Sequence, residues 1–309
     1  MIIDFGKELR SYFKIMTIGI DIGGSNIKGV LLSDNKIIAK TKIPTKSKSN
    51  KEIIIAQIFE CIRDLLKNRK QIKRIGIGVA GPVDIKKQKI LNPPNVRALK
   101  NLYLGKIIEK KFNIKTIIDN DVHCLVLAEA ILGAGKGKKI VVGLGLGTGV
   151  GGGIVMDKKL YYGARGPSGE IGHTTIVKNG RKCNCGNRGC LETYTNEKGI
   201  RKTAKEILGK EIDTITLFEM AKESNKKAIK AWEITGRYLG IGLANLVDIL
   251  NPDIIVIGGG IAGAGEFLLG PAKKEMKKNI LSPIAKNTKV VRAKLGEFAG
   301  AIGAGLLHY

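Results

Sequence analysis

The chain has 309 residues, which is long enough for two domains with a hydrophobic core each. It carries 53 Lys and Arg against 27 Asp and Glu, and the resulting charge of +26 suits either nucleic-acid binding or attraction of anionic small molecules. The lysines are spread along the chain without a long basic tract, which favours compositional bias over a DNA-binding surface. No secretory segment opens the chain, and its longest uncharged run, residues 140–156, is rich in glycine, so we expect a cytoplasmic protein without a membrane span.

The first part of the chain alternates apolar strands with helices. A polar lead-in, residues 1–15, comes before them, and we expect catalysis not to need it. Apolar runs bounded by turn residues predict strands, and apolar stripes at helical spacing predict helices. The predicted strands are 17–22, 26–32, 36–42, 73–78 and 115–118, and the predicted helices are 51–67, 102–112 and 121 to about 132.

The second half of the chain repeats the opening. Residues 142–156 match residues 18–32 at an offset of 124, with Gly29 falling on Gly153. In a chain with 41 glycines such an overlap can arise by chance, so the pattern alone leaves that alternative open. Asp21 of the first copy corresponds to Gly145 of the second. Two copies of one scaffold, one with a carboxylate and one without, indicate a cleft with asymmetric chemistry.

Strands alternate with helices to the end of the chain, which is typical of an α/β protein. The remaining helices are predicted at 197–208, 217–223, 226–250, from about 265 and at 297–307, and the remaining strands at 253–257 and 289–293. We predict one domain of residues 1–120 plus 297–309 and a larger one of residues 121–296.

Three of the five cysteines lie in one stretch, residues 170–192, which we call the metal loop. Cys183, Cys185 and Cys190 follow His173, and one imidazole with three thiolates completes a tetrahedral Zn²⁺ shell with no position left for water. A closed shell indicates a structural ion. The alternative is three unrelated thiols, or a disulfide with a spare cysteine.

Three glycine-rich turns follow apolar strands: Gly23-Gly24-Ser25, Gly147-Thr148-Gly149 and Gly258-Gly259-Gly260. Glycine lets backbone N–H groups approach phosphate oxygens, and the serine and threonine hydroxyls add donors. Strand ends also need glycine for ordinary reasons, and none of the turns is a Walker A loop. Together with Asp21, the three turns predict a nucleotide bound with Mg²⁺ between two domains.

Asn120 and Asp121 stand where a predicted strand ends and a helix begins. Side chains at such strand ends gather at the ligand site of open α/β sheets. The alternative is a helix cap, which needs no function and excludes none. A carboxylate here can take the proton of an attacking hydroxyl while other groups carry the phosphoryl charge. His123, further into the helix, is assigned no role, and His308 is expected to be exposed.

The motifs DIGGSNIKG, GLGLGTGVGGG, the Asn-Asp pair, EIGH with CNCGNRGCLE, and IVIGGGIA resemble, in kind and order, those of the ROK family of sugar kinases and repressors. The resemblance covers residue 17 to the end. It implies the actin/hexokinase-like (RNase H-like) fold, in which two related α/β domains close over a cleft that holds sugar and ATP. It further implies an ATP-dependent, glucokinase-like enzyme of carbohydrate metabolism and glycolysis, with Mg²⁺ and structural Zn²⁺.

The resemblance also implies site roles, with Asp121 as the catalytic base and His173 both binding zinc and facing the sugar. The implied sugar contacts are Gly81, Asn95, Asn120, Asp121, Glu170, His173 and Glu192. The implied nucleotide contacts are Asp21, Gly23, Gly24, Ser25, Asn26, Lys28, Gly147, Thr148, Gly149, Gly258, Gly259 and Gly260. We expect loss of the metal loop to weaken sugar binding and leave ATP affinity little changed, since the glycine turns lie elsewhere.

Glucose, phosphorylated at its 6-hydroxyl, is the expected substrate, with N-acetylmannosamine, N-acetylglucosamine or fructose as alternatives in the same family. A ROK-type sugar-sensing regulator is a further alternative. Such members carry an N-terminal helix-turn-helix, for which the residues before Met16 leave no room, and often lack the catalytic Asp. A general nucleic-acid binder would rest on charge alone. Family precedent implies a homodimer or homotetramer with sugar and nucleotide as ligands and no specific nucleic-acid partner.

Overall fold

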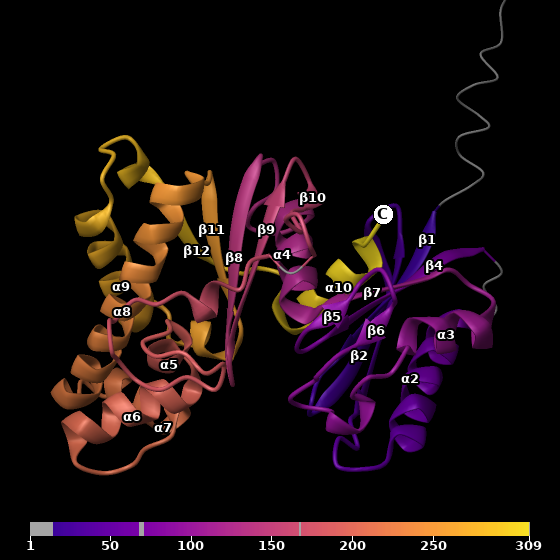
Figure 1. Ribbon diagram of the computed structural model, residues 1–309, viewed down its shortest axis with the longest axis horizontal. Helices are drawn as coiled ribbons and strands as arrows, with labels where there is room; N and C mark the ends of the chain where they lie inside the picture. The colour runs from indigo at the N-terminus through magenta and orange to yellow at the C-terminus, as the bar shows by residue number, and fades with distance from the viewer. Residues whose placement is uncertain (1–14, 68–70, 167, 309) are drawn as a thin grey trace, which may run out of the picture. The chain divides into compact units, whose positions relative to one another are not determined.

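The computed structural model describes residues 15–67, 71–166 and 168–308. Contacts within the chain divide it into two compact α/β units, each built around its own five-stranded sheet (Figure 1). Unit 1 comprises Met1–Ala128 and Leu295–Tyr309, and unit 2 comprises Glu129–Lys294. These limits differ from the boundaries predicted after residues 120 and 296, because helix α4 (Asp121–Ile131) begins in unit 1 and continues into unit 2. All but the last residue of the lead-in 1–15 lies outside the described residues.

Unit 1 contains a mixed sheet with the strand order β3-β2-β1-β4-β7. The first three strands form an antiparallel meander, and the other two run parallel to the first. The strands are β1 (Met16–Ile22), β2 (Asn26–Ser33), β3 (Lys36–Pro44), β4 (Ile72–Val79) and β7 (Thr116–Asn120), and a small hairpin, β5 (Val83–Asp84) with β6 (Lys89–Ile90), follows β4. The helices are α2 (Lys51–Leu66), α3 (Leu104–Phe112) and α10 (Ala299–Leu306), with 3-10 turns η1 (Arg97–Leu99) and η5 (Gly296–Phe298).

The sheet of unit 1 packs side chains on one face and a helix backbone on the other. Ile18 and Ile20 of β1 are fully buried in a core that includes the isoleucines of α2. Gly19, between them, points to the opposite face, where an added Cβ would lie 1.9 Å from the carbonyl oxygen of Ala301 in α10. Side chains alternate between the two faces of a strand, so glycine here lets α10 lie directly on the sheet. Helices α2 and α3 cover the face of the sheet that carries Ile18 and Ile20 (Figure 1).

Unit 2 contains a sheet with the corresponding order, β10-β9-β8-β11-β12, and the same pattern of antiparallel and parallel pairs. Its strands are β8 (Ile140–Leu146), β9 (Val150–Met156), β10 (Lys159–Leu160), β11 (Ile254–Gly258) and β12 (Lys289–Arg292). Its helices are α5 (Glu192–Thr195), α6 (Glu197–Leu208), α7 (Thr214–Lys222), α8 (Lys226–Leu250) and α9 (Glu266–Asn279), with 3-10 turns η2 (Ile171–His173), η3 (Gly260–Ala264) and η4 (Ala285–Asn287).

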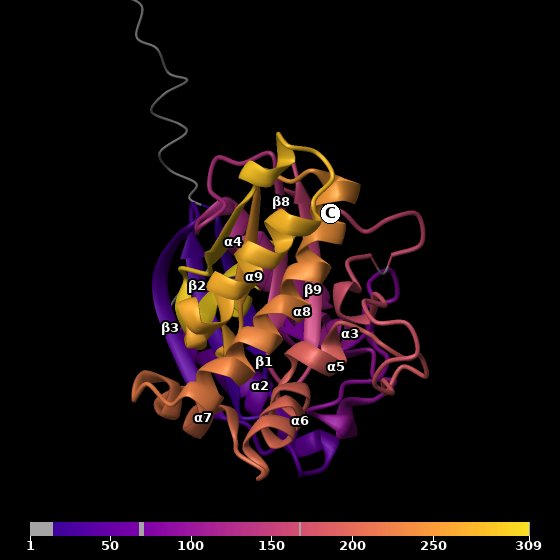
Figure 2. The ribbon, with the colours of Figure 1, turned by 90° about the vertical axis from the view of Figure 1, so that its left-hand side faces the viewer.

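Helices α8 and α9 lie side by side in unit 2 (Figure 2). Gly236 and Gly240 of α8 bring the two backbones close, because a Cβ at either position would lie within 2.6 Å of a carbonyl oxygen of α9. Trp232 of α8 is 1% exposed and belongs to the core beneath them. Within the described part of the chain, no helix is long and apolar enough to cross a membrane.

The predicted repeat is confirmed for the first strand of each hairpin and corrected by one residue for the second. Strands β1 and β8 correspond at the offset of 124. Ile20 pairs with Gly29 across the first hairpin and Leu144 pairs with Gly152 across the second. Gly29 therefore corresponds to Gly152 and not to Gly153. The shift arises because the pairs that close the hairpins enclose residues 23–26 in unit 1 and only residues 147–149 in unit 2.

Candidate active site and metal cluster

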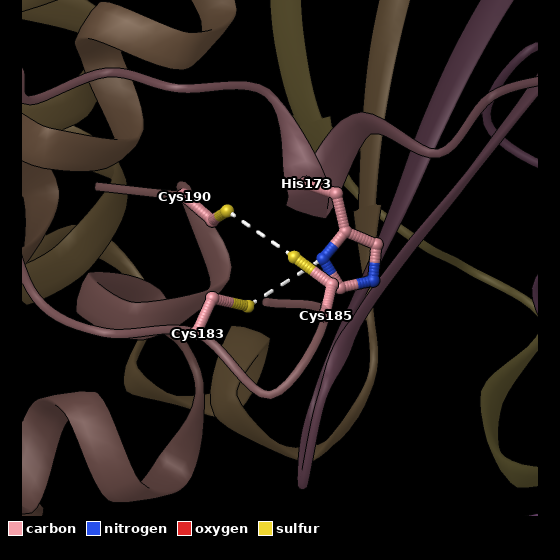
Figure 3. Close-up of side chains that lie close together, drawn as sticks. All are labelled: His173, Cys183, Cys185 and Cys190. Carbon is pink, nitrogen blue, oxygen red and sulfur yellow. Dashed lines mark hydrogen bonds between the residues drawn. The ribbon is translucent and has the colours of Figure 1, made fainter. Parts of the chain in front are cut away.

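The four predicted metal ligands meet in unit 2 (Figure 3). His173 ends η2, and the three cysteines come from the loop that follows it. The Nδ1 atom of His173 lies 3.6 Å from Cys183 Sγ, and the sulfur atoms of Cys185 and Cys190 are 3.7 Å apart. All four donor atoms lie within 4.8 Å of one another and point toward a common centre.

These separations fit a tetrahedral zinc ion. With Zn–S bonds of about 2.3 Å and a Zn–N bond of about 2.0–2.1 Å, the S···S edge of a tetrahedron is about 3.8 Å and the S···N edge about 3.6 Å. The two sulfur atoms that lie 3.7 Å apart are not bonded, and all five cysteines are free, so the alternative of a disulfide with a spare cysteine is wrong. The donor set therefore suits Zn²⁺, with Nδ1 as the histidine ligand.

Backbone contacts and one arginine hold the metal loop in place. The Cys183 N–H donates to the Asn187 carbonyl at 2.8 Å, which closes the tip of the loop. Arg181 reaches from the loop to the helices beyond it, and its Nη1 donates to the carbonyl oxygens of Thr193 at 3.2 Å and Gly199 at 2.9 Å. The Arg181 side chain is 13% exposed and lies over the ring of Tyr194. Sequence reasoning missed this contact, because nothing in the spacing links an arginine to carbonyls 12 and 18 residues away.

Two glutamates stand at the ends of the metal loop, and they differ in their contacts and in their exposure to solvent. Glu192 begins α5, and its Oε2 accepts the Val150 N–H at 2.8 Å. Its Oε1 lies 4.0 Å from Cys183 Sγ, so this carboxylate faces both the metal cluster and the start of β9. Glu170 precedes η2 and is exposed.

The turn Gly147-Thr148-Gly149 lies against this end of the metal loop. A Cβ added to Gly149 would be 2.8 Å from Glu192 Oε2. Asn196, which follows α5, donates from Nδ2 to the Thr148 carbonyl at 3.1 Å. The expectation that the glycine turns lie away from the metal loop is therefore wrong for this turn.

The turn Gly23-Gly24-Ser25 in unit 1 lies between Asp21 and the loop that carries Asn95. A Cβ on Gly24 would be 3.0 Å from the Asn95 Cβ, and Thr45 Oγ1 donates to the Gly23 carbonyl at 2.8 Å. Burial, followed by the charge of Asp121, raises the pKa of Asp21 to about 7, although the nearby Lys28 lowers it. Two carboxylates and a glycine-rich turn therefore share one region of unit 1.

Asn120 caps α4, as the alternative interpretation of the Asn-Asp pair proposed. Its Oδ1 accepts the N–H groups of Val122 at 2.8 Å and His123 at 3.2 Å, and its Nδ2 donates to the Gly81 carbonyl at 3.1 Å. Asp121 Oδ1 accepts the Val122 N–H at 2.9 Å. Burial raises the pKa of Asp121, whereas its backbone hydrogen bond and the nearby His123 lower it. A carboxyl group with a raised pKa at a strand end is the form that a general base takes.

His123, which was assigned no role from the sequence, forms a buried pair with Asp119. Its Nδ1 lies 2.9 Å from Asp119 Oδ1, and the two side chains are 10% and 1% exposed. Asp119 also accepts the Asn120 N–H at 2.7 Å. The pair thus braces the residues on both sides of Asp121. The i, i+4 spacing of the two residues was the available signal, but it spans a strand end and a helix start, where helical spacing alone predicts no contact.

The remaining predicted site residues lie partly in unit 1 and partly in unit 2. In unit 1, Gly81 adopts a φ of +96° beside the Pro93-Pro94 loop, and Lys28 donates to the Glu297 carbonyl at 2.9 Å. In unit 2, Gly258 ends β11 paired with Gly145, and Gly259 adopts a φ of +84° against Leu146. Asn26 accepts the Gly23 N–H through its carbonyl at 3.0 Å, and Gly260 has open space around it.

Comparison with known proteins identifies one matching family and relatives that align along most of the chain. A model of the ROK family matches residues 17–309. A glucokinase from Halalkalibacterium halodurans is 33% identical over 94% of this chain and 94% of its own length. A xylose repressor from Bacillus spizizenii is 32% identical over 93% of this chain and 75% of its own length.

Solved structures give the same picture. A ROK hexokinase from Thermus thermophilus matches with a TM-score of 0.84 and 30% identity over 94% of this chain and 97% of its own. A ROK family glucokinase from Streptomyces griseus, solved with glucose and AMPPNP, matches with a TM-score of 0.79 and 29% identity over 94% and 98%. Two units with sheets of like order, and these neighbours, define the actin-like two-domain fold. The chain belongs to the ROK family, which confirms the resemblance carried by its motifs.

Proposed function

We propose that this protein is an ATP-dependent hexose kinase that phosphorylates glucose at its 6-hydroxyl. The observation that carries the proposal is Asp121, a carboxyl group with a raised pKa that stands at the start of α4, in the same unit as Asp21 and the Gly23-Gly24-Ser25 turn. A base beside a phosphate-type turn is the arrangement that phosphoryl transfer to a hydroxyl requires.

In the proposed reaction, the Asp121 carboxylate accepts the proton of the sugar hydroxyl as the hydroxyl oxygen bonds to the γ-phosphorus of ATP. The bond between that phosphorus and the bridging oxygen breaks, and ADP leaves. The N–H groups of the glycine turns hold the phosphates. Asp21 is the carboxylate that we assign to the Mg²⁺ of the nucleotide, an ion that neutralises phosphate charge when bound.

We assign the sugar hydroxyls to Asn95, Asn120, Glu170, His173 and Glu192, with Gly81 beside them. The hydrogen bonds that Asn120 and His173 already make within the protein determine which of their donor groups remain for the sugar. Asn120 uses its Oδ1 and one N–H within the protein, so its second N–H is the group left for a ligand. With Nδ1 toward the metal, His173 offers Nε2–H as a donor.

The free thiols suit a reducing compartment, and we propose that the enzyme is cytoplasmic. We further propose that it forms a homodimer or homotetramer.

A coupled ADP-release assay with ATP tests the proposal, using glucose, mannose, fructose, N-acetylglucosamine and N-acetylmannosamine in parallel. The xylose repressor among the relatives makes a sugar-sensing regulator the second candidate. We expect turnover with glucose to exceed that with the other sugars, and Asp121→Asn to abolish it. Sugar binding without turnover on any member of the panel would favour the regulator instead.

A further inference from the structure

The turn Gly147-Thr148-Gly149 has all of its carbonyl groups bonded, whereas two of its N–H groups find no acceptor in the described part of the chain. The Gly147 carbonyl accepts the Glu197 N–H at 3.0 Å, the Thr148 carbonyl accepts Asn196 Nδ2 at 3.1 Å, and the Gly149 carbonyl accepts the Gly147 N–H at 2.9 Å. In residues 15–67, 71–166 and 168–308, no acceptor meets the N–H groups of Thr148 and Gly149. A turn in this state presents donors and withholds acceptors, which is what an anion requires.

The bonds to the carbonyls also set the direction of the two N–H groups. The Thr148 carbonyl and the Gly149 N–H belong to one trans peptide plane and point in opposite directions, and so do the Gly147 carbonyl and the Thr148 N–H. Asn196 and Glu197 hold both carbonyls from the side of α6. Both N–H groups therefore point away from α6. Without these bonds, the glycines on either side of Thr148 would let each peptide plane rotate.

Asn196 makes this contact with an amide that has a second task. Its Oδ1 accepts the Gly199 N–H at 2.8 Å and caps α6, while its Nδ2 donates to Thr148. Asn196 is 9% exposed. Since one end of the amide must accept and the other must donate, both bonds fix a single orientation of the side chain.

Building on the proposed function, we infer that Asn196 is a positioning residue for nucleotide binding, because it aims the N–H groups of Thr148 and Gly149 at the phosphates. Asn196 lies just beyond the metal loop, and Glu192, at the end of that loop, holds the Val150 N–H. The segment from Glu192 to Glu197 therefore supports the metal loop on one side and the glycine turn on the other.

The test replaces Asn196 with serine, which keeps a neutral cap on α6 but cannot reach the Thr148 carbonyl. The matched control is Asn225→Ser. Asn225 caps α8 in the same way, through the N–H groups of Lys227 at 3.1 Å and Ala228 at 3.0 Å, and makes no recorded contact with the turn. Titration calorimetry with a non-hydrolysable ATP analogue gives Kd, and hydrogen exchange gives the protection of residues 147–150.

We expect Asn196→Ser to raise the Kd for the analogue about 3- to 10-fold, the range of one net hydrogen bond, with the sugar KM changed less than about twofold. With the analogue bound, Thr148 and Gly149 should be less protected from exchange in Asn196→Ser than in the parent, and Asn225→Ser should change neither the Kd nor this protection. Asn196→Asp, which keeps the shape and the cap but loses the donor, should weaken binding too.

Three outcomes overturn the inference: an unchanged Kd in Asn196→Ser, an equal loss in Asn225→Ser, or a parent protein that binds no nucleotide analogue. Failure of the kinase proposal looks different. A parent protein that binds the analogue and loses affinity on Asn196→Ser, but turns over no sugar, refutes the kinase and keeps the inference.

Discussion

The hairpin β1–β2 of unit 1 and the hairpin β8–β9 of unit 2 have the same strand arrangement, but different residues hold their turns in place. Each joins two antiparallel strands by a glycine turn, and in each turn at least two carbonyl groups accept hydrogen bonds from the same unit. In unit 1, Thr45 holds the turn, donating to the Gly23 carbonyl through Oγ1 and to the Ser25 carbonyl through its N–H. In unit 2, Asn196 and Glu197 hold it, from the segment that follows the metal loop.

The chemistry beside the two turns differs more than the turns themselves. Asp21 precedes the first turn, Asp119 lies near the end of β7 in the same sheet, and Asp121 begins the helix that follows β7. The position that corresponds to Asp21 in unit 2 is Gly145, which pairs with Gly258 of β11 as Asp21 pairs with Gly78 of β4. The glycine turn is thus common to both units, whereas the aspartates Asp21, Asp119 and Asp121 belong to unit 1 and the cluster of His173 with three cysteines belongs to unit 2.

The largest effect is expected from Asp121→Asn, which removes the base from unit 1. We expect kcat to fall by about 10²–10⁴-fold with sugar binding retained, as is usual for loss of a general base. Because burial raises the pKa of Asp121, kcat of the parent should also fall on acidification at a pH above that of an ordinary Asp, about 3.9. Steady-state kinetics across pH measure both effects, and a variant with more than about half the parent kcat contradicts the role.

Cys185→Ser acts on unit 2 and should remove zinc. Collapse of the metal loop displaces His173 and Glu192, and a shift of ~1 Å in positioning groups costs on the order of 10²-fold in rate. We expect a sharp rise in the sugar KM and, because Glu192 holds Val150, a smaller rise in the nucleotide KM. Asn184→Ser, a change at an exposed residue between two ligands, is the control. Elemental analysis and separate KM values decide, and a zinc-free variant with a normal sugar KM would make the metal a remote structural clip.

Gly259→Ala should destabilise the fold, because the new Cβ would lie 2.1 Å from the Leu146 carbonyl oxygen at a φ of +84°. A cost of about 2–4 kcal/mol is typical of strain at such a position. Gly260→Ala is the control, since a Cβ there meets nothing within 4 Å. Chemical denaturation of the two variants measures the difference, and equal stabilities would refute the packing at this turn.

The smallest effect is expected from Asp21→Asn on stability, measured without ligands. The folded state holds the Asp21 proton up to about pH 7, whereas the unfolded chain releases it near 3.9, so the folded state binds more protons between these values. Stability is therefore present at low pH and lost as pH rises through that window. The variant should exceed the parent by about 1–4 kcal/mol at pH 8 and match it at pH 4. Denaturation curves at the two values check this, and a constant difference would contradict it.

Local patterns predicted the elements well and long-range contacts poorly. The helices 197–208 and 226–250 lie where the apolar stripes place them, and the metal cluster follows from four residues within one short stretch. The one-residue difference in turn length between the two hairpins could not be predicted, because both turns are rich in glycine. Only the strand pairing shows how many residues each turn contains. The bond from Asn196 to Thr148 spans 48 residues. An Asn before a helix predicts the cap, but nothing in the sequence predicts the second partner.

The placement of α10 on the glycine face of unit 1 has a consequence for synthesis of the chain. Gly19 is made early, and the helix that lies on it comes from residues 299–306, so this part of the first sheet stays without its covering helix until unit 2 has been synthesised. Unit 2 is continuous in sequence and has all its strands before that point. We therefore expect unit 2 to complete its fold before unit 1, and the part of the first sheet that awaits α10 to be the surface that chaperones shield in the nascent chain.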